Sequence, residues 1–503
     1  MATQKLQTQG LPRVVFASSV GTLIEWYDFY LFGSLASIIS LQFFPKGNPT
    51  AALLSTLAAF AAGFVVRPFG AVFFGRLGDL VGRKYTFLVT LSLMGGATFL
   101  IGLVPSYETI GFLAPAIVVS LRLLQGLALG GEYGGATTYV GEHSPVGKRG
   151  FYTSWIQTTA TVGLLVSLLV IQGVKGSMSE QDFADWGWRI PFLLSIFLLM
   201  ISIYIRVRME ESPLFKKLKD EGKISTNPLK ESFGNKKNLK YVLLALLGAT
   251  MGQGVIWYTG QFYALRFIRS QGMEFTQTNN VVLIALVFAT PFFIVFGALS
   301  DKIGRKWIMA LGMFLGIMTY FPIYKKMHGV IDTSNKVKIE ASSSESTGSM
   351  VEDNTRYDVT TANNQYTDGT KAKIVTKINL ETGEETVKRT INLGDNAFWW
   401  LVVLIFIQVI YVTMVYGPIA AFLIELFPTK IRYTSMSLPY HIGNGVFGGL
   451  VPLISTALVV FATQRGDDDA YLAGLWYPIG VAAVCLVISV FYINHRSYQM
   501  AED

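Results

Sequence analysis

Long apolar stretches, separated by short polar segments, dominate this chain. A helix needs about 20 mostly apolar residues to cross a bilayer. Twelve stretches approach that length, and they lie near residues 14–40, 52–74, 85–104, 110–140, 151–173, 190–207, 240–268, 280–299, 307–324, 398–424, 433–461 and 471–493. The pattern therefore predicts an all-α polytopic membrane protein with twelve transmembrane helices.

One long polar segment, residues 329–395, interrupts this pattern between the ninth and tenth apolar stretches. It is rich in Ser, Thr, Asn, Lys and Glu. Within it, residues 371–380 and 385–393 alternate polar and apolar positions around Thr382-Gly383, which is typical of a β-hairpin. We therefore expect a small β-rich module here, and a disordered loop is the alternative.

Two short charged motifs each occur twice along the chain. Residues 75–84 and 297–306 both fit G-x-x-x-D-x-x-G-R-K, and E-x-x-P-x-x-x-R begins at Glu142 and again at Glu425. The aspartate of the first motif precedes the glutamate of the second by 63 residues in the first half and by 124 in the second. The repetition indicates an internal duplication, with about 61 extra residues inserted into the second half.

These patterns predict how the chain is organised. Residues 1–208 form an N-terminal six-helix bundle, and residues 209–239 form a cytoplasmic linker. Residues 240–328 and 396–503 form the C-terminal six-helix bundle, and residues 329–395 are the insertion between its third and fourth helices.

Composition and charge agree with a membrane protein. Hydrophobic residues make up 51% of the chain and charged residues 15%, whereas about 25% are charged in a typical soluble protein. Residues 206–240 contain ten Lys and Arg. The positive-inside rule then predicts that both termini are cytoplasmic and that the insertion is extracytoplasmic. This topology accounts for the net charge of +8, so no nucleic-acid partner is needed.

Several function classes lack support in the residues. There is no P-loop, no His/Cys metal cluster and no G-x-S-x-G elbow, so we expect neither an enzyme nor a cofactor or metal. The single cysteine, Cys485, excludes a disulfide within the chain. No small-residue cleavage site follows the first apolar stretch, so that stretch is expected to remain as a helix.

The duplicated motifs supply candidate gating residues. Their aspartates can accept backbone N–H bonds at a helix start or pair with an arginine, and their glutamates are potential partners of the basic residues. Pairs that form and break would make a cytoplasmic gate, and simple positive-inside anchoring is the alternative. The candidates are Asp79, Arg83, Lys84, Glu142, Asp301, Arg305, Lys306 and Glu425.

Charged residues inside apolar stretches are costly and usually face a cavity or a partner. Glu25 and Asp28 are spaced i, i+3 and share a helix face. Neighbouring carboxyl groups in an apolar setting favour the protonated form of one of them, which suits a proton carrier. Arg122 and Glu132 lie in the fourth stretch, and we expect all four residues to take part in proton coupling. A fixed structural ion pair is the alternative.

Other polar and aromatic residues within the apolar stretches are candidates for binding a substrate. The two glutamines of segment seven are the least easily explained as packing, whereas its aromatic residues could be interfacial and the histidine a packing residue. The candidates are Arg67, Tyr133, Gln157, Gln253, Trp257, Tyr258, Gln261 and His441.

Together these residues resemble the major facilitator superfamily. The two G-x-x-x-D-x-x-G-R-K loops resemble its signature, and RLLQGLALGG, starting at Arg122, resembles its fourth-segment arginine motif. More narrowly, EWYDFYLFG, GGEYGGA, WGWRIPF and FPTKIRYTSMSLPYHIG resemble the metabolite:H+ symporter family, which carries dicarboxylates, 2-oxoglutarate, citrate, shikimate, proline or betaine. The resemblance runs from about residue 12 to 495, except for the insertion.

The resemblance implies two six-helix bundles around a central cavity, alternating access, and uptake driven by the proton gradient. From the resemblance we expect gating roles for Asp79, Arg83, Asp301 and Arg305, and a coupling role for Arg122. The fifth stretch lacks the G-P-x-x-G-G pattern of many antiporters, which favours symport.

We therefore expect a proton-coupled symporter that imports a small polar metabolite, with an organic acid as the favoured class. An osmolyte symporter for proline or betaine is the alternative, and a transporter-like membrane sensor is a third reading. The expected partners are a small-molecule substrate, protons and the lipid bilayer. The expected form is a monomer in a bacterial-type cytoplasmic (inner) membrane.

Overall fold

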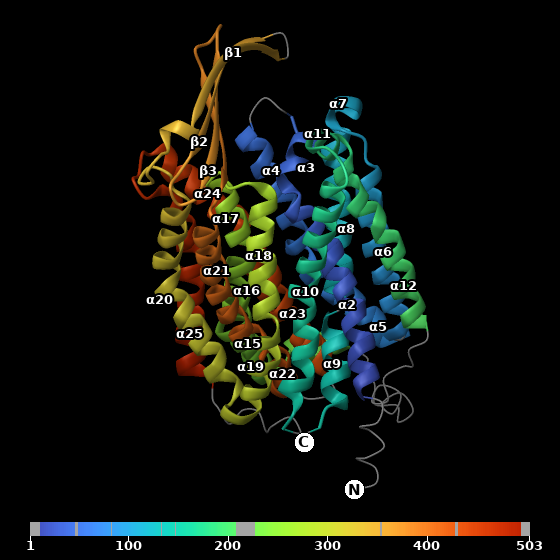
Figure 1. Cartoon of the computed structure of the whole chain (residues 1–503). Helices are drawn as coiled ribbons and strands as arrows, with labels where there is room; N and C mark the ends of the chain where they lie inside the picture. The colour runs from blue at the N-terminus through green and yellow to red at the C-terminus, as the bar shows by residue number, and fades with distance from the viewer. Residues whose placement is uncertain are drawn as a thin grey trace. The chain divides into compact units, whose positions relative to one another are not determined.

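The computed structural model describes residues 11–45, 49–81, 83–131, 133–145, 147–207, 227–352, 355–427 and 431–493 (Figure 1). The chain divides into two compact units. The first comprises residues 1–259, 289–318 and 410–503, and the second comprises residues 260–288 and 319–409. The division into two six-helix bundles therefore stays a prediction.

The first unit is helical, and its N-terminal helices are α2 (Leu11–Ser34), α3 (Ala36–Phe43), α4 (Pro49–Val65), α5 (Arg67–Val81), α6 (Arg83–Leu103), α7 (Tyr107–Ile110), α8 (Leu113–Gly130), α9 (Tyr133–His143), α10 (Arg149–Gly176), α11 (Glu180–Asp185), η1 (Gly187–Arg189) and α12 (Ile190–Val207). Further helices follow in α14 (Pro228–Phe233), α15 (Lys236–Ala245), η2 (Leu246–Thr250), α16 (Met251–Trp257) and α19 (Pro291–Ile303). The last are α22 (Ile419–Leu426), α23 (Arg432–Tyr440), η6 (His441–Gly448), α24 (Val451–Gln464), η7 (Ala470–Leu475) and α25 (Trp476–Tyr492).

The second unit contains helices and a four-stranded sheet. Its helices are α17 (Ala264–Ser270), most of α18 (Phe275–Ala289) and the short η4 (Glu340–Ser342). Three further helices have residues in both units, namely η3 (Tyr258–Tyr263), α20 (Arg305–Ile331) and α21 (Asp395–Tyr416). The strands are β1 (Ser344–Glu352), β2 (Thr355–Gln365), β3 (Lys371–Asn379) and β4 (Glu385–Asn392).

Ten helical segments in the described residues are long and apolar enough to cross a membrane. Two of the twelve predicted stretches are not among them. Residues 14–40 fall on α2 and α3, which contain Glu25 and Asp28, and residues 85–104 fall on α6, whose apolar part covers only Leu88–Leu103. The structure thus supports an all-α membrane architecture, and the count of twelve spans stays a prediction.

Prolines mark several interruptions of the long helices. Pro68 follows the break between α4 and α5, Pro291 begins α19, and Pro418 lies between α21 and α22. Proline lacks a backbone donor and is tolerated in the first turn of a helix, so each segment restarts there. Three π-helical segments, η2, η3 and η6, interrupt the regular α-helical geometry of two further helices. Such π-turns are frequent at functional sites.

Close helix packing in the first unit depends on glycine. A Cβ at Gly126 of α8 would overlap the carbonyl group of Gly63 on α4. Small residues at such positions let two backbones approach closely within a membrane. The packing of α8 against α4 places Arg122 of α8 in the interior of the unit, where it is completely buried.

The sheet of the insertion is antiparallel, with strand order β1-β2-β3-β4 (Figure 1). β3 and β4 pair from Lys371↔Asn392 to Ile378↔Glu385, which matches the predicted hairpin. Gly383 adopts φ 71° in the turn, a conformation that glycine enters without a steric penalty. The sequence analysis did not predict strands β1 and β2, because polar and apolar residues do not alternate clearly in these Ser- and Thr-rich stretches.

The base of the sheet is joined to the loop between α17 and α18. The N–H of Ile391 donates to the carbonyl oxygen of Gly272 at 2.8 Å, and its own carbonyl accepts from Glu274 at 2.9 Å. Gln277 exchanges two further hydrogen bonds with the backbone of Leu393. The insertion is therefore continuous with the helix ends of its unit, and its extracytoplasmic position stays a prediction.

Candidate functional site

The first unit buries Arg67 at the start of α5, next to the break before Pro68. Its side chain is 1% exposed. Its guanidinium carbon lies over the rings of Phe64 at 3.9 Å and Phe29 at 4.5 Å, measured to the ring centroids. Nε and Nη2 are buried and have no hydrogen-bond partner among the described residues. Because buried polar atoms are nearly always paired in proteins, these two donors indicate a place for an acceptor.

Aromatic and polar side chains surround this guanidinium. Four phenols, those of Tyr30, Tyr258, Tyr416 and Tyr440, lie close enough to interact electrostatically with Arg67. The hydroxyl groups of Tyr416 and Tyr440 are 2.9 Å apart. The ring of Tyr440 stacks on that of Tyr133, with 3.6 Å between centroids. Aromatic residues from α9 and α23 therefore meet in the interior of the unit.

A second aromatic group lies beside the first. The rings of Trp26, Tyr30 and Trp257 stack in one cluster, with centroids 5.2 to 6.2 Å apart. The indole Nε1 of Trp257 is buried and has no hydrogen-bond partner in the described residues. The Arg67 guanidinium carbon is 5.4 Å from the centroid of Trp26. The guanidinium of Arg67 and the aromatic faces of this cluster therefore lie next to each other.

The predicted glutamines and the histidine of this unit are also buried. Gln157 Nε2 donates to the Tyr133 hydroxyl at 2.5 Å, and Gln253 Nε2 donates to Asn444 Oδ1 at 3.2 Å. Neither ring nitrogen of His441 has a partner among the described residues. The side-chain carbonyl oxygens of both glutamines also have none there. These atoms offer both donors and acceptors to a polar solute.

The candidate proton-coupling residues occupy the same unit. Glu25 and Asp28 on α2 are 2% and 1% exposed. Arg122 packs against the rings of Phe29 and Phe32, and its Nη1 donates to Gln125 Oε1 at 2.7 Å. No ion pair joins Arg122 to Asp28 in the described residues. Glu132, the fourth candidate, lies outside them.

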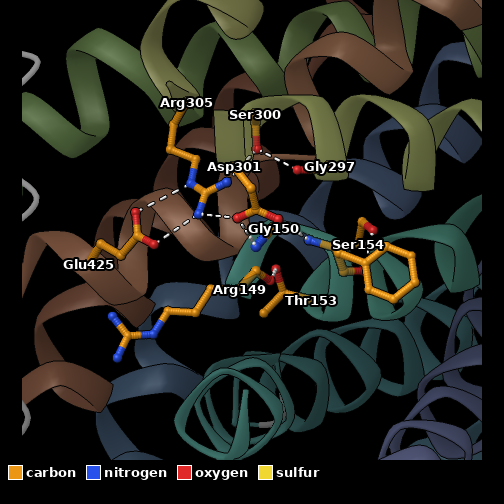
Figure 2. Close-up of polar contacts among 10 residues, drawn as sticks. Arg149, Gly150, Thr153, Ser154, Gly297, Ser300, Asp301, Arg305 and Glu425 are labelled. Carbon is orange, nitrogen blue, oxygen red and sulfur yellow. Dashed lines mark hydrogen bonds and ion pairs between the residues drawn. The ribbon is translucent and has the colours of Figure 1, made fainter. Parts of the chain in front are cut away.

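The second copy of the loop motif forms an ionic cluster (Figure 2). Asp301 accepts hydrogen bonds from the backbone N–H groups of Gly150 and Phe151, both at 2.9 Å. These are two of the N–H groups that the first turn of α10 leaves unpaired. Arg305 contacts Asp301 at 2.6 Å and Glu425 at 2.9 Å. The cluster therefore links α19, α20 and α22 to the start of α10.

Close approach of the two helices allows this arrangement. A Cβ at Gly150 would overlap the carbonyl oxygen of Gly297 on α19 and the guanidinium of Arg305. Arg305 also donates through Nη1 to Ser300 Oγ at 2.6 Å, so its guanidinium is held on three sides. The expected partnership between Arg305 and Glu425 is thus present in the structure.

Lys306 contacts the backbone at the end of α25 instead of the glutamate that the sequence analysis expected as its partner. Its Nζ donates to the backbone carbonyl oxygens of Val490 and Ile493, at 2.8 and 2.7 Å. Successive residues of a helix point about 100° apart, so Lys306 is directed away from Glu425 and toward the end of α25. The side chains of Asp79, Arg83, Lys84 and Glu142 lie outside the described part of the chain.

Comparison with known proteins shows which proteins this chain resembles. A family model described as "Sugar (and other) transporter" matches residues 14–223. The alpha-ketoglutarate permease of Escherichia coli (strain K12) is 28% identical over 97% of this chain and 96% of the permease. The proline/betaine transporter of the same strain is 32% identical over 64% of this chain and 66% of that transporter, just under two thirds of its length.

A solved structure gives the fold. The structure of the major facilitator superfamily proton:xylose symporter XylE matches with a TM-score of 0.64 and 14% identity, over 96% of this chain and 95% of that chain. At 14% identity this match shows the fold of the major facilitator superfamily. The resemblance to the metabolite:H+ symporter family is confirmed.

The structure brings together seven of the eight candidate binding residues. They all lie in the first unit, whereas Gln261 is buried in the second. The sequence interpretation missed Tyr416, Tyr440 and Asn444, which lie beside these residues, and Gln125, which contacts Arg122. For Tyr440 and Asn444 a signal was present, since they flank His441 in a glycine-rich stretch that forms π-turns. The others look like ordinary membrane-helix residues.

Proposed function

We propose that this chain is a proton-coupled secondary transporter that imports a small organic acid by alternating access. The observation that carries the proposal is the environment of Arg67. A guanidinium that is 1% exposed and has two donors without partners matches the planar, bidentate geometry of a carboxylate. A charged substrate would then supply the counter-charge that the neighbouring rings do not.

The groups beside Arg67 favour an acceptor-rich solute. The Tyr258 hydroxyl and the Trp257 indole nitrogen are buried without partners among the described residues. An indole N–H can only donate, and a phenol can donate while it accepts. Carboxylate and carbonyl oxygens satisfy several such donors together. The name of the alpha-ketoglutarate permease agrees with this class of substrate.

A zwitterionic osmolyte is the second candidate. The stacked rings of Trp26, Tyr30 and Trp257 present aromatic faces near Arg67. Aromatic faces bind quaternary ammonium groups, while an arginine can bind the carboxylate of the same molecule. The name of the proline/betaine transporter supports this alternative.

Proton coupling is proposed on the basis of the buried carboxyl groups. Glu25 and Asp28 are one helical turn apart on α2, in an almost completely buried position. Burial favours the neutral form of a carboxyl group, so reversible protonation is the natural way for it to lose its charge. A cycle in which one of them binds a proton with the substrate would drive accumulation.

The ionic cluster around Asp301 is proposed as the gate on the predicted cytoplasmic side. Its charged groups hold α10 against α19, and they must separate if these helices move apart.

We further propose twelve spans in two bundles, cytoplasmic termini, an extracytoplasmic insertion, and a monomer in the inner membrane. The basic loops support this topology.

Solute uptake into proteoliposomes tests the proposed function. Labelled succinate, 2-oxoglutarate, citrate, shikimate, proline and betaine are each supplied with and without an inward proton gradient. Accumulation of an organic acid only with the gradient would support the leading proposal, and accumulation of proline or betaine would favour the osmolyte. If folded protein takes up none of them, the proposed transport function is wrong for these substrate classes.

A further inference from the structure

One face of the four-stranded sheet carries four lysines. Side chains alternate between the two faces along a strand, and residues paired across neighbouring strands share a face. Lys371, Lys373 and Lys377 of β3 are an even number of residues apart and therefore lie on one face. Lys388 of β4 pairs with Val375, which lies on that same face of β3. We call this surface the lysine face.

No acidic residue of β2, β3 or β4 lies on the lysine face. By the strand register, the other residues of these strands on that face are Tyr357, Val359, Thr361, Asn363, Gln365, Val375, Asn379, Thr386, Thr390 and Asn392, together with Thr355. The flanking acidic residues Asp368, Glu381 and Glu384 lie in the connections before and after β3. Asp368 is already paired with Lys336, at 2.8 Å. The lysine face is therefore basic, without a counter-charge along these strands.

The opposite face of the sheet has a different character. Arg356 and Asp358 of β2 lie on it, as do Glu385 and Arg389 of β4, so it carries charges of both signs. It also carries Ile391, which is buried where β4 meets the α17–α18 loop. The concentration of lysine is thus specific to one face, and it does not simply reflect the composition of the insertion.

The lysines are available to a partner. Lys371, Lys373 and Lys388 are exposed, and none of them has a hydrogen bond or an ion pair among the described residues. Lys377 is half-buried, and its Nζ lies 6.0 Å from the centroid of the Tyr357 ring. Like charges at neighbouring sheet positions are unfavourable. A ligand that brings negative charge would relieve this repulsion.

The row of lysines runs outward from the helix ends. Lys371 lies at the base of the sheet, opposite Asn392, and Lys377 lies about 20 Å farther along β3. Lys388 lies between them, about 5 Å to the side on the neighbouring strand. β2 and β3 extend beyond the ends of α17 and α18 (Figure 1). A flat bilayer surface meets such a row at one end, whereas a linear polymer with repeated charges can follow its full length.

The other side chains of the lysine face favour one kind of linear polyanion. Hydroxyl and amide groups, such as those of Thr361, Asn363 and Thr390, both donate and accept hydrogen bonds, as sugar hydroxyl groups do. Single-stranded nucleic acid needs aromatic side chains for its bases to stack on, and Tyr357 is the one aromatic residue of β2, β3 and β4. An acidic peptide would add to an edge strand, whereas three of the four lysines lie on the interior strand β3.

We propose that the lysine face binds an anionic polysaccharide, whose carboxylate, sulfate or phosphate groups pair with the lysines. Lysine ammonium groups bind such anions as point charges, and the threonine and asparagine side chains hydrogen-bond to the sugar hydroxyl groups. Binding of a polysaccharide is independent of transport activity. The proposed extracytoplasmic position of the insertion would expose this face to the polysaccharides of a cell envelope.

Lysine footprinting of the full-length protein in nanodiscs of neutral phosphatidylcholine tests this inference. Heparin, a sulfated polysaccharide, is the probe, and dextran is its uncharged counterpart. Mass spectrometry gives the rate at which an acetylating reagent modifies each lysine. With heparin at about five times its Kd, acetylation of Lys373 and Lys388 should slow about sixfold, and dextran should leave it unchanged. Lys338 is the internal control, because it is exposed in the same unit beside Glu340 and should keep its rate.

Two double variants of equal charge separate the faces of the sheet. In Lys373→Gln/Lys388→Gln, the heparin concentration that half-protects Lys371 should rise about tenfold or more, because two contacts to the polyanion are lost. Arg356→Gln/Arg389→Gln removes the same charge from the opposite face and should behave like wild type. Lys373→Arg/Lys388→Arg keeps both charges and should retain the wild-type affinity. The changed side chains are exposed, and thermal unfolding verifies that each variant is folded.

Several outcomes would overturn polysaccharide binding at this face. Protection of Lys338 equal to that of Lys373, or equal affinities of the two glutamine variants, would mean a nonspecific attraction to a basic protein. Stronger protection by polyglutamate or by a single-stranded oligonucleotide would assign the face to an acidic peptide or to nucleic acid. Protection of Lys373 and Lys388 by phosphatidylglycerol nanodiscs alone would assign it to lipid headgroups. Failure of solute uptake would overturn the proposed transport function and leave the footprint unaffected.

Discussion

Arg305 holds both carboxylate oxygens of Glu425, through Nη2 at 2.9 Å and Nε at 3.3 Å. The two residues are 120 positions apart in the sequence and belong to the two repeated motifs of the second half. The same guanidinium also contacts Asp301, which in turn accepts two N–H groups of α10. A three-membered ionic cluster thus joins motifs that the sequence presents separately.

Asp301→Asn should weaken this cluster. It removes the charge that pairs with Arg305 and one of the acceptors for the start of α10, a loss of about 1–3 kcal/mol. With Cys485 replaced, a cysteine at the buried Ser154 should react about tenfold faster with a maleimide supplied from the cytoplasmic side. The matched variant Asp332→Asn, in the insertion, should leave that rate unchanged. Equal reaction rates in both variants would favour simple positive-inside anchoring.

Arg67→Lys should raise KM for an anionic substrate about tenfold or more, because an ammonium group cannot reproduce the two parallel bonds of the guanidinium fork. Concentration-dependent uptake gives KM and the maximal rate separately. Arg189→Lys is the matched control, because Arg189 donates to the carbonyl oxygens of Gly102 and Val104 and serves the fold. A KM that stays at the wild-type value in Arg67→Lys would remove Arg67 from the binding site.

Asp28→Asn and Glu25→Gln test which carboxyl group carries the proton. The neutral amide mimics the protonated form permanently, so the variant of the carrier should exchange solute but no longer accumulate it against a gradient. Uptake with and without the proton gradient, compared with exchange at equal pH, measures this directly. Unchanged gradient dependence in both variants would exclude α2 as the proton-carrying helix.

Ile391→Ala should destabilise the second unit by about 2–4 kcal/mol, because Ile391 is 3% exposed where β4 meets the α17–α18 loop. Val387→Ala, on the same strand, is the control, since Val387 is 47% exposed and its truncation should cost less than about 0.5 kcal/mol. Thermal unfolding in detergent compares the two. Similar midpoints would mean that the base of the sheet is not tightly packed in solution.

The insertion should also respond to acid through Asp368. Burial acts to raise the pKa of Asp368, but hydrogen bonds from Lys336 and Thr370 outweigh it and hold the pKa below its usual value. The stabilisation is therefore present above about pH 4 and is lost as the pH falls through the lowered pKa. Amide exchange at Thr370, whose N–H donates to Asp368 at 2.9 Å, should quicken over that range. Asp368→Asn should show no such dependence.

Much of the architecture was readable from the sequence, because a bilayer imposes simple rules. Apolar stretches of sufficient length, repeated charged loops and a polar interruption indicated a duplicated helical membrane protein with an insertion. The β3–β4 hairpin was also predictable, since alternation and Thr382-Gly383 are local signals. For α2 and α6, length and composition alone do not decide whether the helix crosses the membrane, because their apolar character is weak.

Within the site, the sequence by itself determined which residues are unusual, and the tertiary structure decided which of them meet. Buried charges such as Arg67, Asp28 and Arg122 stand out in apolar stretches because their desolvation is costly wherever they lie. Thr98 and Gln125 carry no such signal, since an uncharged polar residue in a helix is unremarkable until its neighbour is known. Only helix packing, set by contacts such as Gly126 against Gly63, brings Thr98 of α6 and Gln125 of α8 within hydrogen-bonding distance and turns separate residues into a connected network.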